Sequence, residues 1–256
     1  MQELLDRTTS EMDVAHFDIP EPARPIEAMI APPGGALIMY YTPPYEDFTC
    51  PGRTWYATGD KTRFPLWGEV AVTYHEGVPG HHLHLGVTLY LSEKLSRFQR
   101  ILGQTSGYGE GWALYAERLM AELGYLENPD YYLGMLRGQV VWIVRVIIDI
   151  GMHLVLPVPN DQVFHPGERW TPELGLEFLE QRGFIPDALV ASEVVKHLSV
   201  PGRAIRYKVG ERAWLKAREG AMRRAGASFD LKEFHNRALS MGPMGLDQMS
   251  RELSGV

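Results

Sequence analysis

The chain has 256 residues, of which 45% are hydrophobic, and its formal net charge is −7. This length and composition allow one large domain or two small ones around a substantial core. The negative charge argues against a nucleic-acid surface, which is normally basic and clustered. We therefore expect no nucleic-acid partner.

The cysteine content and the hydropathy of the sequence indicate the cellular compartment of the protein. Cys50 is the only cysteine, which excludes an intramolecular disulfide, and the first residues lack the apolar core of a secretory signal. We therefore expect a cytoplasmic protein. The longest apolar stretch, residues 140–158, is interrupted by Arg145, Asp149 and His153, and it predicts a buried helix rather than a membrane span.

The first 35 residues predict a tether. Residues 2–13 have the spacing of a short amphipathic helix, and the prolines and glycines between residues 20 and 35 then argue against regular structure. The folded domain is expected to comprise residues 36–256. Within it, residues 36–41 and 53–58 are short, apolar and aromatic segments that predict two antiparallel strands.

Helices are expected over most of the remaining chain. Apolar periodicity and Pro or Gly breaks predict them over residues 67–76, 81–93, 96–102, 110–123, 140–156, 172–182, 187–198, 211–226 and 231–239. Thr171 and Asp230 are the expected N-caps of two of these helices. The expected fold class is therefore mainly α with a small β element.

Four of the nine histidines lie within ten positions, from His75 to His84, and Glu76 lies among them. Zinc binds neutral imidazole nitrogens and carboxylate oxygens, and catalytic zinc sites combine three protein ligands with one water. A histidine followed by a glutamate supplies one ligand and a carboxylate that can accept a proton from that water. The cluster therefore predicts a Zn2+ site with His75 as a ligand and Glu76 as the general base.

The spacing of this cluster departs from the HExxH helix, in which histidines at i and i+4 share one face. The i+4 position here is Pro79, which would clash with the carbonyl of His75 in a regular helix, and the neighbouring glycines tolerate unusual dihedrals. We therefore expect a local bulge. A bulge of two residues would bring His81 to the ligand position, and a bulge of three would bring His82.

The motif HEGVPGHH at residues 75–82 resembles the signature of the bacterial domain-of-unknown-function 885 family, zinc metallopeptidases of the gluzincin type. Six further motifs of this family occur along the chain in the order in which the family has them. They are YYTPP at 40–44, PGRTWYATG at 51–59, EGWALYAERL at 110–119, RVIIDIGMH at 145–153, PGRAIRYKVGE at 201–211 and FDLKEFHNRALSMGPMGLDQM at 229–249. The resemblance runs from about residue 38 almost to the end, and ordered motifs are far more specific than a single one.

The resemblance implies a gluzincin-like catalytic domain. Members of this family usually carry a long helical region before these motifs, so this chain is expected to be the C-terminal half, with a partner chain or the missing N-terminal region completing the cleft. In gluzincin-like peptidases an edge strand beside the zinc-binding helix holds extended substrate. The two predicted strands either do this or simply cover the core.

The resemblance also implies a third zinc ligand from a second helix packed against the first. Glu110, at the start of the helix predicted over residues 110–123, is the expected ligand. Glu117 lies about two turns further on near the same face, and is either the ligand instead or an acceptor for a ligand histidine. A solvated helix face is the alternative for both residues.

Arg145, Asp149 and His153 form one polar stripe at i, i+4 and i+8 of an apolar helix. Buried charges need partners, and an Arg145–Asp149 pair beside a satisfied core histidine would provide them. The resemblance favours instead a stripe that faces the metal, where Asp149 orients a ligand imidazole and His153 or Arg145 contacts the substrate.

The function predicted from these residues is zinc-dependent hydrolysis of a peptide or small amide, with His75, His81 and Glu110 as ligands and Glu76 as general base. Tyr207 follows a Pro-Gly turn, and the resemblance favours a hydrogen bond from its phenol to the oxyanion over a packing role. Two other functions stay open: a catalytically impaired metal-binding or peptide-binding module that lacks its N-terminal half, and a hydrolase of non-peptide amides or esters.

Overall fold

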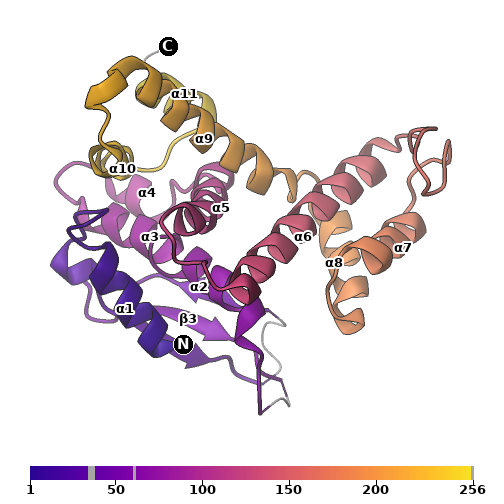
Figure 1. Ribbon diagram of the computed structural model, residues 1–256, viewed down its shortest axis with the longest axis horizontal. Coiled ribbons are helices and arrows are strands. Elements are labelled where there is room, and N and C mark those ends of the chain that lie inside the picture. Colours follow the sequence, from indigo (N-terminus) through magenta and orange to yellow (C-terminus); the bar gives the residue numbers. More distant parts are fainter. Residues whose placement is uncertain (34–37, 60–61, 255–256) are drawn as a thin grey trace.

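The computed structural model describes residues 1–33, 38–59 and 62–254 and is mainly helical (Figure 1). The α-helices of these residues are α1 (Gln2–Met12), α2 (Val70–Glu76), α3 (His81–Tyr90), α4 (Arg97–Ile101), α5 (Ser106–Glu122), α6 (Pro129–Leu154), α7 (Pro172–Arg182), α8 (Asp187–Ser199), α9 (Ile205–Ala225), α10 (Leu231–Ser240) and α11 (Leu246–Ser254). The shorter 3-10 helices are η1 (Glu21–Ala23), η2 (Leu66–Gly68) and η3 (Gly226–Ser228). The predicted fold class, mainly α with a small β element, is confirmed.

The predicted helices are present, and they differ from the prediction mainly at their first residues. Helix α5 begins at Ser106 instead of 110, and α6 begins at Pro129 instead of 140. Asn128 caps α6 with its side chain, a start signal that the strong apolar run after residue 140 obscures. The predicted N-caps Thr171 and Asp230 each accept a hydrogen bond from the first turn of their helix.

The sheet has three strands, β1 (Ile26–Ile30), β2 (Tyr40–Thr42) and β3 (Gly52–Tyr56), in the order β1-β3-β2. Strand β2 is antiparallel to β3, as predicted, with Tyr40 opposite Trp55. Residues 36 and 37 of the first predicted strand lie outside the described residues. Strand β1 pairs in parallel with β3, and the prediction misses it because it lies within the proline-rich stretch.

Residues 1–33 do not form the predicted tether. Helix α1 buries Leu5 and Met12, and Phe17 is fully buried. The ring of Phe17 packs edge-on against Trp112 and stacks on His235, with centroid distances of 6.2 and 5.1 Å. These residues are therefore part of the folded core.

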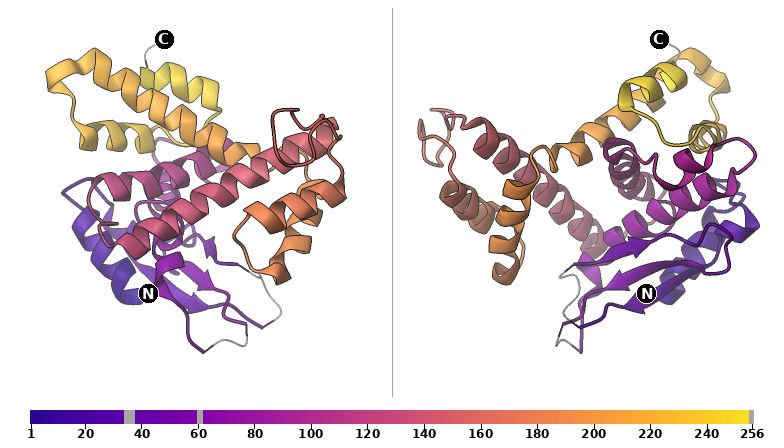
Figure 2. Two further views of the ribbon diagram at one scale, coloured as in Figure 1. Left: turned by 45° about the vertical axis from the view of Figure 1, so that its right-hand side comes forward. Right: turned by 180° about the vertical axis from the view of Figure 1, so that it is seen from behind.

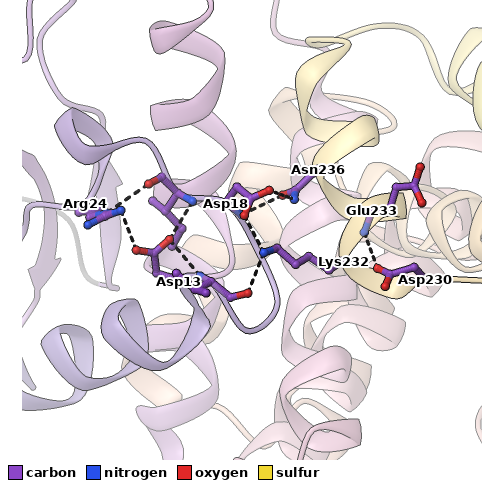
Figure 3. A network of polar contacts seen from close by, with 9 residues as sticks. Asp13, Asp18, Arg24, Asp230, Lys232, Glu233 and Asn236 are labelled. Atoms are coloured by element: carbon purple, nitrogen blue, oxygen red, sulfur yellow. Dashed lines mark hydrogen bonds and ion pairs between the residues drawn. The ribbon is translucent and has the colours of Figure 1, made fainter.

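Polar contacts also join the N-terminal segment to α10 (Figure 3). The carboxylate of Asp18 lies 2.6 Å from Nζ of Lys232 and accepts a hydrogen bond from Nδ2 of Asn236 at 2.6 Å. Asn236 in turn accepts one from the backbone N–H of Asp18 at 3.0 Å, and Lys232 donates to the carbonyl of Val14 at 2.7 Å. The first residues of the chain are thereby fixed to residues more than 200 positions later.

The main core forms where α5 packs against α9. The buried rings of Trp112 and Trp214 meet there with centroids 5.0 Å apart. The two backbones approach so closely that a Cβ on Gly111 would lie 2.4 Å from the carbonyl carbon of Gly210, so only glycine fits at this contact. This close approach brings the start of α9 beside Glu110 near the start of α5.

A second, smaller core lies where α7 and α8 pack on the C-terminal part of α6. We call this part of the molecule the wing (residues 144–199). Its buried residues include Ile148, Trp170 and Val194. The wing projects from the main body, and α9 leads the chain back to it (Figures 1 and 2). In the part of the chain that the structure describes, no helix combines the length and hydropathy that a membrane crossing requires.

Candidate metal centre

Three side chains from three helices converge at one point: His75 near the end of α2, His81 at the start of α3 and Glu110 in α5. Each offers one ligand atom, and these atoms lie within 4.8 Å of one another. The Nε2 atoms of His75 and His81 lie 3.6 and 3.3 Å from Oε2 of Glu110. Two imidazole nitrogens and a carboxylate oxygen are a donor set that zinc accepts, so these residues form a candidate metal centre.

The chain between α2 and α3 is a complete break, and not the predicted bulge within one helix. It contains a cis peptide bond before Pro79, and a Cβ on Gly80 would lie 1.9 Å from the carbonyl oxygen of His75. The buried indole of Trp112 donates to the carbonyls of Pro79 and Gly80 at 2.8 and 3.2 Å, which holds the break against α5. The result is that the ring of His81 lies 4.8 Å from that of His75.

His82, the alternative ligand, is not part of this group. Its Nδ1 atom lies 2.8 Å from the hydroxyl of Tyr41 on β2, and the side chain is fully buried. Burial lowers the pKa of His82 to about 4, so it is neutral at physiological pH. His84 is buried as well and lies beside the ring of Tyr108. Both histidines are therefore buried packing residues and not members of the candidate metal centre.

Glu117, the alternative ligand on α5, contacts the other nitrogen of His75. Its Oε1 atom lies 2.7 Å from Nδ1 of His75, and both side chains are buried. A carboxylate at this position fixes the tautomer of a metal-binding histidine and orients its ring. Glu117 is therefore placed to accept a hydrogen bond from His75, and it lies on the side of the His75 ring that faces away from the candidate ligand atoms.

The centre combines three carboxylates with two imidazoles. Burial alone would lower the pKa of His75, but hydrogen bonds to Glu110 and Glu117 raise that pKa well above its ordinary value. Burial would raise the pKa of Glu110, but its contacts with His75 and His81 hold that pKa well below the usual range. The pKa of Glu76 is raised by burial, which the nearby His81 and His75 offset only in part. The excess of carboxylates favours a cation at this place.

Arg206, in the first turn of α9, contacts the centre directly. Its Nη2 atom lies 3.0 Å from Oε1 of Glu110, the oxygen that does not approach the histidines. The same nitrogen donates to the hydroxyl of Tyr207 at 3.1 Å. Arg206 therefore holds Oε1 of Glu110 in place, and Oε2 is the oxygen that could bind a metal ion. The sequence prediction misses this role because no local spacing connects residue 206 with residue 110.

Tyr207 lies next to the centre, and a second unpredicted residue, Trp142 of α6, supports it. The ring of Trp142 stacks on that of Tyr207 and on that of His75, with centroid distances of 4.1 and 5.9 Å. Burial raises the pKa of the Tyr207 phenol, and the charge of Glu110 adds to this effect. The hydroxyl therefore stays protonated at neutral pH and can donate a hydrogen bond.

Asp149 does not orient a ligand imidazole, and it does not pair with Arg145. Its carboxylate accepts hydrogen bonds from the backbone N–H groups of Gly202 and Ala204, at 3.0 and 2.7 Å. These groups belong to the turn that precedes α9. Both interpretations of Asp149 are therefore wrong, because the turn between α8 and α9 folds back onto α6 and supplies partners that no helical spacing reveals.

Arg145 and His153, the other members of the polar stripe, also find partners in the wing. Nη2 of Arg145 lies 2.7 Å from Oε2 of Glu193 on α8, and Nε2 of His153 donates to the carbonyl of His197 at 2.9 Å. Neither residue contacts the candidate ligands His75, His81 or Glu110. Arg145 also lies over the ring of Trp142, 4.7 Å from its centroid, and this ring stacks on those of His75 and Tyr207. The stripe thus joins α6 to α8 and α9, and of its three members Arg145 comes near the candidate metal centre, through Trp142.

Comparison with known proteins identifies the family. A family model described as "Bacterial protein of unknown function (DUF885)" matches residues 1–253, so the chain belongs to this family. The match begins at residue 1 and not near residue 38, where the motifs indicate its start. No match is found among the curated proteins.

Two solved structures resemble this one. A protein from Colwellia psychrerythraea, described as a "putative lipoprotein", has a TM-score of 0.85 and 32% identity over 99% of this chain. A "putative lipoprotein of unknown function" from Shewanella oneidensis has a TM-score of 0.70 and 20% identity over 98%, which shows the shared fold alone. The chain spans 41% and 44% of the lengths of these proteins. Its assignment to their C-terminal half and its cytoplasmic location stay predictions.

Proposed function

We propose that this protein is a zinc-dependent hydrolase of the gluzincin type that cleaves peptide or amide bonds. The observation that carries the proposal is the approach of the ligand atoms of His75, His81 and Glu110 to within 4.8 Å of one another. Two histidines and a glutamate are the protein ligands of thermolysin-type zinc sites, which leave a fourth position for water. The contact between Glu117 and Nδ1 of His75 adds the supporting carboxylate that such ligands usually have.

Glu76 is the general base in this proposal. Zinc in the centre would lower the pKa of a coordinated water toward about 7 and polarise the substrate carbonyl. Glu76 accepts the proton of the attacking water and later delivers it to the leaving nitrogen. Burial raises the pKa of Glu76, and a pKa closer to the working pH favours a residue that must both accept and donate a proton.

In the proposal Tyr207 donates a hydrogen bond to the substrate carbonyl oxygen, and Arg206 positions Tyr207. The Tyr207 phenol is protonated, and it supplies a hydrogen bond to the carbonyl oxygen as negative charge develops there. Arg206 contacts both the Tyr207 hydroxyl and Oε1 of Glu110, so it fixes the distance between the phenol and the ligand carboxylate. A preorganised donor of this kind contributes more than one that must reorient during the reaction.

A second candidate function follows from the length comparison. The chain spans 41% of the Colwellia psychrerythraea protein. In the second candidate function turnover requires further residues of such a longer protein, and the present chain by itself is a metal-binding or peptide-binding module without turnover. A hydrolase of non-peptide amides or esters uses the same centre, and a substrate panel separates it from a peptidase.

Metal analysis combined with anomalous scattering tests the proposal. The purified chain should contain zinc, and scattering at the zinc absorption edge should place the ion between His75, His81 and Glu110. Absence of zinc, or an ion held by other residues, contradicts the proposal. Bound zinc with chelator-sensitive peptide cleavage supports the peptidase, whereas bound zinc without cleavage of any peptide, amide or ester supports the module.

A further inference from the structure

Trp142 of α6 contacts both a candidate zinc ligand and the expected donor to the substrate oxygen. Its ring is nearly parallel to that of His75, with an interplanar angle of 12° and centroids 5.9 Å apart. It is also nearly parallel to the ring of Tyr207, with an angle of 20° and centroids 4.1 Å apart. Aromatic rings in such stacked arrangements attract one another. One indole therefore restricts two side chains that have different tasks in the proposed reaction.

The imidazole of His75 needs a second contact in addition to its hydrogen bond. Oε1 of Glu117 lies 2.7 Å from Nδ1 of His75 and fixes that end of the ring. A single hydrogen bond leaves the ring plane free to tilt, because the second side-chain torsion of histidine has a broad range. A tilt changes the direction of the Nε2 lone pair, which a metal would bind. Stacking on Trp142 restricts this tilt.

The phenol of Tyr207 is held in a similar way by two contacts of different kinds. Nη2 of Arg206 donates a hydrogen bond to the hydroxyl at 3.1 Å. The stacked indole of Trp142 restricts sideways movement of the ring, which would displace the hydroxyl. Arg206 therefore fixes the polar end of Tyr207, and Trp142 fixes its aromatic body.

The indole of Trp142 is itself fixed from the wing. Arg145, one helical turn later on α6, places its guanidinium carbon 4.7 Å from the centroid of the indole. Nη2 of Arg145 lies 2.7 Å from Oε2 of Glu193 on α8, and these side chains are only 10% and 5% exposed. A cation over an aromatic face is attracted to it, more strongly where water is excluded. A buried ion pair between two helices thereby supports Trp142.

We propose that Trp142 is a positioning residue of the hydrolase, which holds the rings of His75 and Tyr207 in fixed orientations relative to one another. The inference rests on the proposed function and adds a residue to it. Trp142 acts through these two side chains and not on the reacting atoms. A tryptophan that only filled space would contribute to stability alone, whereas a positioning residue also affects zinc affinity and the rate constant of turnover.

Trp142→Leu tests the proposal because it keeps apolar volume but removes the ring. Zinc affinity, measured by competition with a chelator, should fall about 10-fold. At saturating zinc, kcat for a peptide should fall about 100-fold, since small displacements of positioned groups have effects of this size. KM should stay nearly unchanged, because the loss falls on the transition state. Trp142→Phe keeps a stacked ring and should recover most of both quantities.

Trp67→Leu is the matched control. Trp67 is also half-buried, and it lies 5.4 Å from the guanidinium carbon of Arg137, another arginine of α6. This variant should keep the zinc affinity and kcat of the wild type. Circular dichroism and urea denaturation show whether each variant is folded under the conditions of the assay.

A double-mutant cycle separates positioning from a general loss of structure. In a Tyr207→Phe background the hydroxyl is already absent, so Trp142→Leu should reduce kcat much less than it does in the wild type. The loss of zinc affinity should stay about 10-fold in this background, because it acts through His75. A loss of kcat that is equally large in both backgrounds contradicts the proposal.

The outcomes distinguish this inference from the proposed function. If the wild type binds zinc and cleaves peptides, and Trp142→Leu equals it in zinc affinity and kcat, only the inference for Trp142 is overturned. A Trp142→Phe variant as impaired as Trp142→Leu overturns it as well. A wild type that binds no zinc overturns both. Zinc binding without turnover overturns the hydrolase, and the zinc affinities of the variants then decide the inference for His75.

Discussion

Two polar clusters of this protein, the candidate metal centre and the stripe on α6, have similar compositions but differ in what satisfies their side chains. In the centre, Nδ1 of His75 is bound to Glu117, while Nε2 approaches the other ligand atoms. In the stripe, Asp149 accepts two backbone N–H groups and Arg145 pairs with Glu193. Polar atoms that face one another can hold a ligand, whereas polar atoms with backbone and ion-pair partners stabilise the fold.

The difference shows that a polar residue can position the residues of a site without contacting the site itself. Asp149 binds the turn before α9, and the first turn of α9 carries Arg206 and Tyr207. The stripe thereby fixes the helix that carries two residues of the candidate centre. The following predictions test the division of roles between the two clusters, from the largest expected effect to the smallest.

The largest effect is expected at Glu76 in the centre. Glu76→Gln removes the proton acceptor but leaves the three candidate ligands, so peptide hydrolysis should fall by about 1,000-fold with zinc content unchanged. Steady-state kinetics and metal analysis measure both quantities. Glu93→Gln, at an exposed position after α3, is the control and should keep full activity. Equal activity of both variants would remove Glu76 from the mechanism.

The next effect is expected in the stripe and concerns stability. Asp149→Asn leaves one backbone N–H without a good acceptor and removes the charge from both hydrogen bonds, so the free energy of unfolding should fall by about 3 kcal/mol. Urea denaturation measures this loss, and zinc affinity of the folded variant should be retained. Loss of zinc at unchanged stability would instead restore the interpretation in which Asp149 orients a ligand.

Glu117→Gln should weaken zinc binding without unfolding the protein. The amide still accepts a hydrogen bond from Nδ1 of His75 but lacks the charge that increases the basicity of the ring, so zinc affinity should fall about 10- to 100-fold. Competition with a chelator measures the affinity. His153→Gln, in the stripe, should leave it unchanged, and a similar loss in both variants would contradict the separation of the two clusters.

The smallest effect concerns a buried histidine outside both clusters. Burial lowers the pKa of His235 to about 3, below the value of about 6.5 in an unfolded chain. The unfolded state then binds more protons, so the stability that is present above pH 6.5 decreases as the pH falls toward 3.

Between pH 7 and pH 5.5, His235 alone should reduce the free energy of unfolding by about 1 kcal/mol. Urea denaturation at the two pH values should show this additional loss in the wild type relative to His235→Phe. Parallel losses in the two proteins would show that His235 is not buried as a neutral ring. The comparison uses one state of metal loading throughout, because metal binding adds a pH dependence of its own.

Much of the local structure follows from the sequence because its causes are local. The helix over residues 172–182 has the predicted bounds, since Thr171 caps it and Pro172 fits its first turn. The sequence also predicts that the regular helix cannot continue through Pro79, and it predicts His75 as a metal ligand with His81 or His82 as the second. These inferences depend on single-residue sterics, helix periodicity and metal-ligand chemistry, whereas the choice of Glu110, with Glu117 as the alternative, depends on the family resemblance.

The remainder depends on contacts between distant segments, which local patterns do not encode. The sequence could not choose between His81 and His82, because the indole of Trp112 and the sheet at Tyr41 decide where each ring lies. Strand β1 forms only because β3 supplies its hydrogen-bonding partner.

The roles of the polar side chains also required the tertiary structure. Arg206 reaches Glu110 only because α9 packs on α5 at two glycines, and Asp149 binds a turn more than 50 residues away. The sequence by itself determined where most of the helices form and which side chains can bind a metal. The tertiary structure decided which of these polar groups face one another and which stabilise the fold, because their partners lie far apart in the chain.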